Sequence, residues 1–558
     1  MRRFLTPLAV ALVLVALVLA TQATIAVGSP GVVSKVLVRG APIHGANGMA
    51  INAQGRIYVG SVFGREIVIV NSRTGRIVDR LGPDDGFNGA DDVTFGPDGS
   101  LYWTDILAGK VGRLESNGTM TMQDVAPFVN PITFSADGRL FVAQAFFGAG
   151  LYELDPELAD PPVLRMPGSA VPPFLDQFNG FDFGPDGKLY APHPFLGTIV
   201  RIDVDTWTEE IVADGLPFPV ALKFNAKGKL YAALQNSGDV VRVFRATGKT
   251  RVVARLQPGL DNLAFDARDR MFVSHAGNGR IWRILPSGQP RRLIRGGLVA
   301  PGGIAVMRYQ EPAVHDRLFV ADGWEIKKYD GRNGRAEGVI RQSFTGPSII
   351  AALTASSDGR YLILTSWLDA AVQVWDPVTS TEVGLWTDIL GPLNAIRFGE
   401  DLVIADLATS SVILQTPAGL RTTLAGPLVV PTGLAAKGGD LWAADWAAGV
   451  VYQLVDDGVN LPAPVAVATG LNQPEGLAVD RDGTLLVVEA GAGRLTRIDP
   501  ATGAKTLVRG RLALGAPGAP GMPPTWFFNG VAVGGRGDIY VTGDKTDVVY
   551  RIKVVPTR

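Results

Sequence analysis

DDVTFGPDGSLYWTD, residues 91–105, decides the fold of this chain because its pattern returns along almost the whole sequence. Apolar and aromatic residues alternate with smaller or polar ones on either side of Asp98-Gly99, which is a typical signal for a β-hairpin. The same pattern is found in NGMAINAQGRIYVGS (47–61), NGFDFGPDGKLYAPH (179–193) and EGLAVDRDGTLLVVE (475–489). Each unit continues into a third predicted strand, in phrases such as VRID or IWRIL.

Twelve such units follow one another after residue 30. They are spaced roughly forty to fifty residues apart, which is the period of a four-stranded propeller blade. Twelve blades in one ring would leave a very wide central hole. The sequence therefore predicts an all-β fold of two tandem six-bladed β-propellers with four-stranded blades. A single solenoid or two unequal rings are the alternatives.

A recurring fourth-strand phrase predicts how each ring closes. KTLVRG (505–510) and RRLIRG (291–296) resemble SKVLVRG (34–40), which lies ahead of the first unit. A strand supplied before the first blade can complete the last blade of its ring and remove an exposed edge. We therefore expect residues 34–40 to close on 260–285, and residues 291–296 to close on 528–554. The turn-rich residues 286–290 then separate a first propeller (30–287) from a second one (289–558).

Composition excludes several classes of function. Lys and Arg (52) nearly balance Asp and Glu (53), so no overall field favours nucleic acid or an anionic membrane. The absence of cysteine removes disulfides, thiolate nucleophiles and Cys-ligated metal centres. With four histidines and no HExxH, GxSxG or Walker phosphate motif, imidazole-rich zinc, serine-hydrolase and nucleotide chemistry are not expected. A small molecule is the expected partner.

The N-terminus has the form of an export signal. In MRRFLTPLAVALVLVALVLATQA (1–23), two arginines precede an apolar run and a small-residue end suited to signal peptidase. An uncleaved membrane anchor is the alternative, because the run is nearly long enough to span a bilayer. We expect the rest of the chain to be secreted or periplasmic, either free or tethered outside the cytoplasmic membrane.

Blade geometry identifies the positions that face the mouth of each tunnel. The first strand of a blade starts, and the second ends, on the same face of the ring, so these positions lie side by side. Five of the six openers in the first ring are amides or carboxylates: Asn47, Asp91, Asn130, Asn179 and Asp261, with Val220 as the sixth. In the second ring Glu475 is the only charged opener, accompanied by the amides Asn394 and Asn529.

The ends of the second strands carry a repeated aspartate that we interpret as structural. An aspartate at this position commonly accepts hydrogen bonds from backbone N–H groups of the blade turn. The residues concerned are Asp105, Asp322, Asp406 and Asp445. His193 and His275 break this rule, and Asp91 brings charge to a blade opening, so these three are candidate catalytic residues. Val220 and Leu234 leave an apolar sector suited to the greasy part of a substrate.

The phrases DDVTFGPDGSLYWTD, NGFDFGPDGKLYAPH and NQPEGLAVDRDGTLLVVEAGAGRLTRID resemble the senescence marker protein/gluconolactonase/luciferin-regenerating superfamily and related NHL-repeat propellers. They are also similar to virginiamycin B lyase-like repeats. In the gluconolactonase group the ring centre holds a divalent metal, commonly calcium, through one Glu and several Asn or Asp oxygens. The resemblance implies such ligands at Glu475, Asn394 and Asn529 in the second ring, or at Asp91, Asn130, Asn179 and Asp261 in the first.

The expected chemistry follows from these ligands. Oxygen atoms converging on one axis suit Ca²⁺, with Mg²⁺ or Zn²⁺ as alternatives. Such a metal would polarise a lactone carbonyl and activate a water, while a histidine or carboxylate moves the proton. We therefore expect a divalent-metal-dependent hydrolase of a lactone or related ester. A metal-dependent lyase of the virginiamycin B lyase type and a non-catalytic extracellular binding scaffold are the alternatives.

Overall fold

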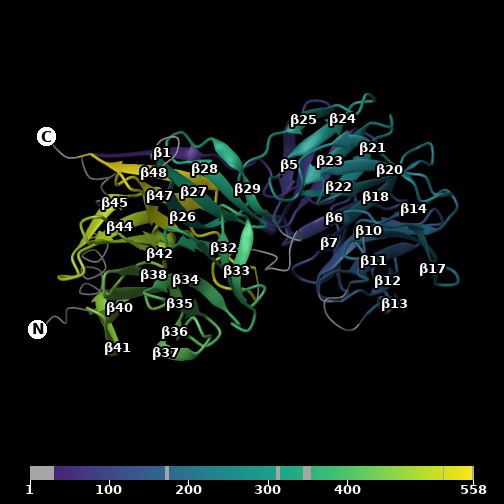
Figure 1. The fold of residues 1–558 in the computed structure, drawn as a ribbon. Coiled ribbons are helices and arrows are strands. Elements are labelled where there is room, and N and C mark those ends of the chain that lie inside the picture. The colour runs from purple at the N-terminus through teal and green to yellow at the C-terminus, as the bar shows by residue number, and fades with distance from the viewer. Residues whose placement is uncertain are drawn as a thin grey trace, which may run out of the picture.

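A computed structural model describes residues 31–146, 148–169, 175–309, 315–342, 353–519 and 521–555. These residues are all-β apart from two short 3-10 turns, Pro83–Asp85 and Ala490–Ala492. Their strands form twelve four-stranded antiparallel sheets, the form of propeller blades. In Figure 1 the sheets gather in two groups that lie side by side.

The predicted signal peptide or anchor, residues 1–23, lies outside the described residues. Within the described part of the chain, no helix has the length and apolar character needed to cross a membrane.

The opening stretch shows why each unit folds as a hairpin. Val93 pairs with Trp103 and Phe95 with Leu101 across the two strands, so their large side chains lie on the same face of the sheet. Between them, Gly99 has a φ of 83°, a left-handed conformation that glycine adopts without steric cost. Asp98 accepts a hydrogen bond from the backbone N–H of Ser100 at 3.0 Å, which fixes the turn.

Six sheets form what we call the first ring. In chain order they are β2 (Met49–Ile51), β3 (Arg56–Ser61), β4 (Glu66–Asn71), β5 (Ile77–Leu81); β6 (Ala90–Phe95), β7 (Leu101–Asp105), β8 (Lys110–Leu114), β9 (Met120–Asp124); β10 (Val129–Phe134), β11 (Leu140–Gln144), β12 (Leu151–Leu154), β13 (Val163–Met166); β14 (Asp182–Phe183), β15 (Leu189–His193), β16 (Thr198–Asp203), β17 (Thr208–Ala213); β18 (Pro219–Phe224), β19 (Leu230–Leu234), β20 (Asp239–Val243), β21 (Thr250–Arg255); β22 (Leu260–Phe265), β23 (Met271–His275), β24 (Ile281–Ile284), β25 (Pro290–Ile294).

The other six sheets form the second ring. They are β26 (Pro301–Tyr309), β27 (His315–Asp322), β28 (Glu325–Asp330), β29 (Ala336–Gln342); β30 (Thr354–Ser357), β31 (Leu362–Ser366), β32 (Ala371–Asp376), β33 (Thr381–Trp386); β34 (Pro392–Phe398), β35 (Asp401–Asp406), β36 (Ser411–Gln415), β37 (Arg421–Ala425); β38 (Pro431–Lys437), β39 (Asp440–Asp445), β40 (Val450–Asp456), β41 (Val459–Ala468); β42 (Pro474–Val479), β43 (Leu485–Glu489), β44 (Arg494–Ile498), β45 (Lys505–Arg509); and β46 (Val531–Val533), β47 (Ile539–Gly543), β48 (Val548–Val554) with β1 (Val32–Val38).

Contacts between the first strands of the sheets close each set into a cycle. In the first ring, β2, β6, β10, β14, β18 and β22 contact one another in this order, and β22 contacts β2. The second ring repeats the arrangement with β26, β30, β34, β38, β42 and β46, and β46 contacts β26. The start of each sheet therefore lies at the centre of its ring, which is where the sequence analysis placed the blade openers.

Both predicted strand closures are wrong. Strand β1 pairs with β48, from Val32 opposite Val554 to Val38 opposite Val549, and so completes the second ring rather than the first. Figure 1 shows the purple N-terminal strand beside the yellow C-terminal one. Residues 290–294 form β25 and pair with β24 of their own sheet, with Ile294 opposite Ile281. The recurring phrase marks the fourth strand of a blade, and the sheet β46–β48 is the one that lacks its own.

These pairings place the whole first ring between β1 and β26 of the second ring. The strands consequently do not follow the predicted ranges 30–287 and 289–558, since the first range lacks β25 and contains β1 without its partner. The two crossings between the rings lie together, because Gly40 forms a parallel bridge with Leu298 and the N–H of Ala41 donates to the Leu298 carbonyl at 2.7 Å.

Polar and apolar contacts join the two rings beyond the crossings. The Lys327 ammonium donates to the carbonyls of Gly277 at 2.6 Å and Gly297 at 3.1 Å. His44 of the first ring contacts Asp547 of the second at 2.8 Å. A cluster of buried apolar residues fills the interface: Ala41, Val299, Ala300, Leu353, Ala519, Trp526 and Phe527. The two rings are thus held together by a hydrophobic interface as well as by the chain.

Candidate functional site

The repeated aspartates at the second-strand ends tether the loop that leads into each blade. Asp445 accepts hydrogen bonds from the backbone N–H groups of Val429 and Val430 at 2.8 and 3.0 Å. Asp406 accepts one from Gly391 at 2.8 Å, and Asp322 accepts two from residues 299 and 300. Asp105 differs in that it accepts one from Ala108, in the turn after its own strand, at 3.1 Å. The structural interpretation of this position is confirmed.

The two candidate catalytic histidines fulfil the same structural role with the opposite hydrogen-bond polarity. The His275 Nε2 atom lies 2.7 Å from the carbonyl of Pro258, and the His193 Nδ1 atom lies 3.3 Å from the carbonyl of Gln177. Both carbonyls belong to the loop before the first strand of the same blade, so the imidazoles bind acceptors where the aspartates bind donors.

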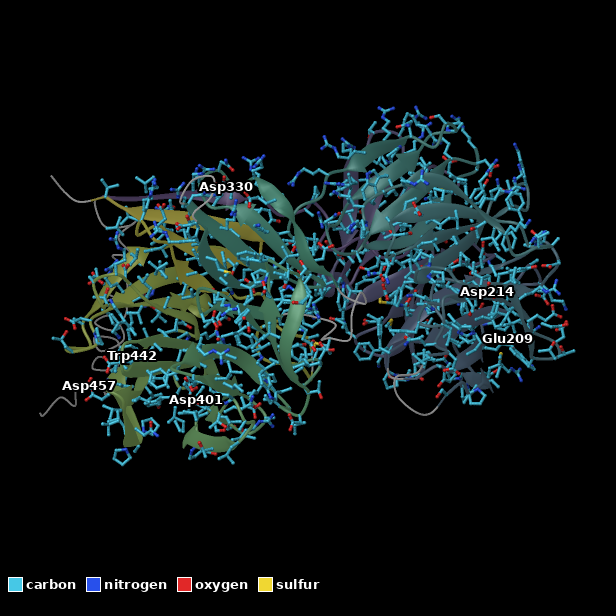
Figure 2. All side chains as sticks on the ribbon, in the orientation of Figure 1. Glu209, Asp214, Asp330, Asp401, Trp442 and Asp457 are labelled. Carbon is cyan, nitrogen blue, oxygen red and sulfur yellow. The ribbon has the colours of Figure 1, made fainter. Side chains whose placement is uncertain are left out.

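The surroundings of the two histidines differ. Burial and the nearby Lys327 ammonium lower the pKa of His275 to about 3, so the ring is neutral near pH 7. His193 is buried against Phe178, and its Nε2 atom lies 3.4 Å from Glu209. Figure 2 shows Glu209 on the side of the first ring that faces away from the second. Neither His193 nor His275 is among the residues that line the central cavity described next.

The largest described cavity lies between the mouth of the first ring and the facing edge of the second. Its volume is about 600 Å³. The first ring supplies a polar floor made of Asn47, Asp91, Asn130, Gln177, Asn179, Gln235 and Asp261. Four of these, Asp91, Asn130, Asn179 and Asp261, are the ligands predicted for this ring, and the structure brings them to one place.

Two carboxylates on this floor, the buried Asp91 and the partly buried Asp261, lack a compensating cation among the cavity-lining residues. Burial, followed by the Asp261 and Asp92 carboxylates, raises the pKa of Asp91 well above its usual range, while a hydrogen bond from the Asn47 side chain opposes the rise. Burial and Asp92 raise the pKa of Asp261 to about 7. Among the residues that line the cavity there is no Lys, Arg or His. When both carboxyl groups are ionised, the floor is therefore negative, and their raised pKa values show that the protein favours the protonated, neutral forms.

Asp92, next along the chain, is engaged in the fold and not in the cavity. Its carboxylate accepts hydrogen bonds from the N–H groups of Val93 at 3.0 Å and Ile132 at 3.2 Å, and from the Asn262 side chain at 3.2 Å. These bonds link three blades of the first ring around the axis. Asp91 therefore lines the cavity and Asp92 stabilises the fold, because adjacent residues of a strand point to opposite sides.

The donor set of the floor fits a hard divalent cation. Ca²⁺ and Mg²⁺ bind carboxylate and amide oxygens, and the floor offers Asp91 and Asp261 with the amides of Asn130 and Asn179. A bound cation would also remove the repulsion that raises the pKa of the two carboxyl groups. The absence of cysteine and of lining histidine makes the floor a poor fit for the ligands that zinc favours.

The corresponding position of the second ring is closed. Glu475, Asn394 and Asn529 line a cavity of only about 60 Å³ on its axis. The Glu475 carboxylate accepts hydrogen bonds, all at 2.7 Å, from the Thr525 hydroxyl and from the backbone and side-chain nitrogens of Asn529. The Asn529 side-chain oxygen accepts one from the Asp544 N–H at 3.1 Å. The side-chain oxygens of Glu475 and Asn529, two of the three predicted ligands, therefore already accept hydrogen bonds within the protein.

The second ring instead contributes a roof over the first ring's cavity, which sequence analysis missed. Its lining residues are Trp324, Leu353, Trp367, Leu368, Asp369, Ala370, Met522, Trp526 and Phe527. Phe63 of the first ring meets this roof, with ring centroids 5.1 Å from Trp324 and 5.3 Å from Phe527. Of the predicted apolar sector, Val220 lines the cavity, whereas Leu234 is not among the lining residues.

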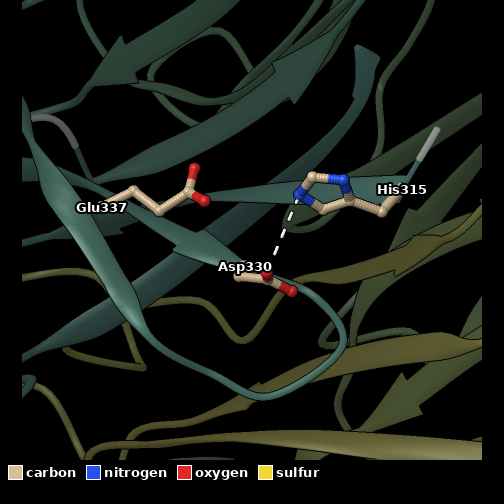
Figure 3. A group of neighbouring side chains, drawn as sticks. All are labelled: His315, Asp330 and Glu337. Atoms are coloured by element: carbon tan, nitrogen blue, oxygen red, sulfur yellow. Dashed lines mark ion pairs between the residues drawn. The ribbon is translucent and has the colours of Figure 1, made fainter. Parts of the chain in front are cut away.

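A second group of possible metal ligands lies in the sheet β26–β29 of the second ring. His315, Asp330 and Glu337 have ligand atoms within 4.8 Å of one another (Figure 3). Arginines already neutralise both carboxylates, since Arg332 pairs with Asp330 at 2.7 Å and Arg317 with Glu337 at 2.9 Å. This group is better explained as an ion-pair cluster than as a cation site.

Residues 92–299 match the family model described as the SMP-30/Gluconolactonase/LRE-like region. The resemblance predicted from the repeats is confirmed. The match lies on the first ring, which contains the open polar floor. No curated protein sequence gives a significant match.

Solved structures give further likenesses. Virginiamycin B lyase from Staphylococcus aureus has a TM-score of 0.37 and 15% identity, covering 51% of this chain and 95% of the lyase. A putative gluconolactonase has a TM-score of 0.37 and 14% identity, covering 48% and 95%. An extracellular domain of a putative one-component system from B. thetaiotaomicron has a TM-score of 0.33 and 11% identity, covering 92% and 78%.

Proposed function

We propose that the chain is a secreted or periplasmic enzyme built from two six-bladed propellers, the first inserted between β1 and β26 of the second. We further propose that it is a divalent-metal-dependent hydrolase of a lactone or related ester. The observation that carries the proposal is the pair of uncompensated carboxylates, the buried Asp91 and the partly buried Asp261, on the open floor of the first ring. The family match on residues 92–299 supports this choice of ring.

In this proposal, Asp91, Asp261 and the amide oxygens of Asn130 and Asn179 hold the cation, with Ca²⁺ as the expected ion. When bound, the ion would supply polarisation of the substrate carbonyl. Asp91 lines the cavity beside the proposed cation, so its carboxylate is the acceptor that we assign to the proton of the attacking water. The water oxygen adds to the carbonyl carbon, the ester C–O bond breaks, and the proton passes to the departing oxygen.

A lyase that removes a proton next to a carbonyl would use the same floor, and it is the second candidate. The same Asp91 carboxylate, which lines the cavity, would then accept the proton from carbon. Product formation in H₂¹⁸O separates the two reactions, since hydrolysis places the label in the new carboxyl group and elimination does not. A non-catalytic scaffold, the third candidate, would turn over neither kind of substrate.

The metal proposal is tested by titrating Ca²⁺ into the full-length, metal-stripped protein and measuring the heat of binding. Asp261→Asn keeps the size of the side chain but removes a charge, so we expect affinity to fall by on the order of 10- to 100-fold. Glu475→Gln in the second ring is the matched control and should bind Ca²⁺ like the parent. Equal binding by parent and Asp261→Asn, or loss of binding in Glu475→Gln, would contradict the assignment to the first ring.

A further inference from the structure

The roof of the cavity differs in chemistry from its floor. Of the nine roof residues contributed by the second ring, eight are apolar, and three of these are tryptophans: Trp324, Trp367 and Trp526. The first ring adds apolar walls between floor and roof from Phe63, Leu107, Phe128, Phe146, Phe195 and Phe218. A ligand in this cavity would therefore meet polar oxygens on one side and aromatic surface on the others.

The roof is a fixed part of the interface between the rings. Trp526 and Phe527 are 7% and 3% exposed, and both belong to the buried cluster that joins the rings. Phe63 packs so closely against Gly323 that a Cβ atom added at Gly323 would lie 2.6 Å from the Phe63 ring. Such contacts hold the aromatic surface in position before a ligand arrives, so less ordering is needed on binding.

The charges of the cavity exclude an anionic ligand. Its lining contains the carboxylates Asp91, Asp261 and Asp369 and no basic side chain. A divalent cation would offset at most two of these charges and leave no excess positive charge for an acid group. The lining is also mostly apolar beyond the floor, so the many hydroxyl groups of a sugar lactone would lose water without gaining hydrogen bonds.

We propose that the second ring acts as a specificity wall, and that the cavity takes a neutral, largely apolar ligand of drug-like size with an oxygen-rich reacting group. The volume of about 600 Å³ suits such a molecule. Resting on the hydrolase proposed above, this means an ester or lactone that carries an aromatic or long aliphatic group. The reacting carbonyl faces Asp91 and Asp261, and the apolar part lies under Trp324, Trp367 and Trp526.

Trp367 and Trp446 offer a matched pair of substitutions. Each is the first residue after the second strand of a second-ring blade, β31 and β39, each is partly buried, and each has an indole N–H without a hydrogen-bond partner in the described chain. Trp367 lines the cavity, whereas Trp446 is not among its lining residues. Trp367→Ala therefore removes roof surface, and Trp446→Ala removes the same side chain elsewhere.

The test has a binding arm and a turnover arm, both on the full-length protein. The binding probe is the neutral fluorophore N-phenyl-1-naphthylamine, for which we expect about tenfold weaker binding in Trp367→Ala and unchanged binding in Trp446→Ala. The turnover substrates are γ-dodecalactone and glucono-δ-lactone with added Ca²⁺. We expect γ-dodecalactone to be preferred, and Trp367→Ala to raise its KM about tenfold with a smaller effect on kcat.

The outcomes separate the two proposals. Probe binding that depends on Trp367 without hydrolysis of either lactone supports the apolar ligand class and overturns the hydrolase. Faster turnover of glucono-δ-lactone, unaffected by Trp367→Ala, supports a hydrolase and overturns the specificity wall. Equal probe binding in the parent, Trp367→Ala and Trp446→Ala would also overturn the specificity wall, because the roof would then not contact the probe.

Discussion

The axes of the two rings show how one blade position serves different ends. Asp91 and Asp261 open blades of the first ring, and Glu475 opens a blade of the second. Glu475 receives three hydrogen bonds from Thr525 and Asn529, so its carboxylate is satisfied within the protein. Within the described residues, the Asp91 carboxylate accepts a hydrogen bond only from the Asn47 side chain, and it lies beside another carboxylate. A carboxylate at the axis is thus available to bind a ligand only where the protein supplies few hydrogen-bond donors to it.

The rings also differ in how the chain closes them. The first ring is built from one continuous segment, and its last sheet is completed by β25. The second ring is split around the first and depends on β1, a strand from the other end of the chain. We therefore expect the second ring to be sensitive to changes at the N-terminus that leave the sheets of the first ring intact.

The largest effect is expected from removing that closing strand. Deletion of residues 31–38 exposes the whole edge of β48 and removes Leu37 and Val38, which are 8% and 6% exposed and pack in the core beside the crossing to the first ring. We expect the second ring to lose its fold, seen as rapid proteolysis of residues beyond 300 while 49–294 resist cleavage. Such a pattern requires the rings to differ in stability.

Point substitutions in β1 test the dependence of the second ring on this strand with a smaller loss of stability. Leu37→Ala should cost about 2–5 kcal/mol of unfolding free energy because it leaves a cavity in the core. Val33→Ala, on the same strand but 59% exposed, is the control and should change the melting temperature little. A deletion protein as stable as the parent would show that β1 is dispensable.

The sequence predicted the repeat, the hairpins and the axial position of the blade openers, because each depends on local pattern. It failed on ring closure, since SKVLVRG and RRLIRG are both good fourth strands and nothing local says which sheet lacks one. It also failed on the roof, because Trp367 and Trp446 occupy the same blade position and only the packing of one ring on the other distinguishes them. The contacts of His193 and His275 with loop carbonyls were also not predicted, although an imidazole can tether a loop as an aspartate does.

A smaller effect is expected from pH, because the free energy of unfolding depends on the ionisation of one carboxyl group at each axis, Asp261 in the first ring and Glu475 in the second. Burial raises the pKa of Asp261 to about 7 and that of Glu475 to about 8, above the values near 4 of the unfolded chain. The native state then holds these protons more tightly than the unfolded state does. Stability is therefore fully present below about pH 4 and is lost as pH rises through 7 and 8, by up to about 1.4 kcal/mol per pH unit for each group.

Melting temperatures at pH 5, 7 and 9 measure this loss. In EDTA we expect the parent to melt at lower temperature as pH rises, and Glu475→Gln to show a shallower slope above pH 7. Added Ca²⁺ should restore the share due to Asp261 by favouring its ionised form, and leave the share due to Glu475 unchanged. Calcium that reduced the pH dependence of the parent by the Asp261 share, but had no such effect on Asp91→Asn, would fit the first ring alone. Calcium without effect at any pH would argue against the metal site.

The smallest effect is expected at His193, where the comparison is with the aspartates of neighbouring blades. Its Nδ1 atom lies 3.3 Å from the Gln177 carbonyl, and Gln177 itself lies on the cavity floor. His193→Gln keeps a side chain that can donate to this carbonyl, so it should cost no more than about 1 kcal/mol of stability. If His193 only tethers the loop, kcat at saturating substrate and its pH profile should match the parent. A general base would behave differently, since its loss typically lowers kcat by 10²-fold or more and removes one limb of the pH profile. The pH profile decides the matter, because a weakened tether would shift Gln177 and change KM without moving the pKa that governs turnover.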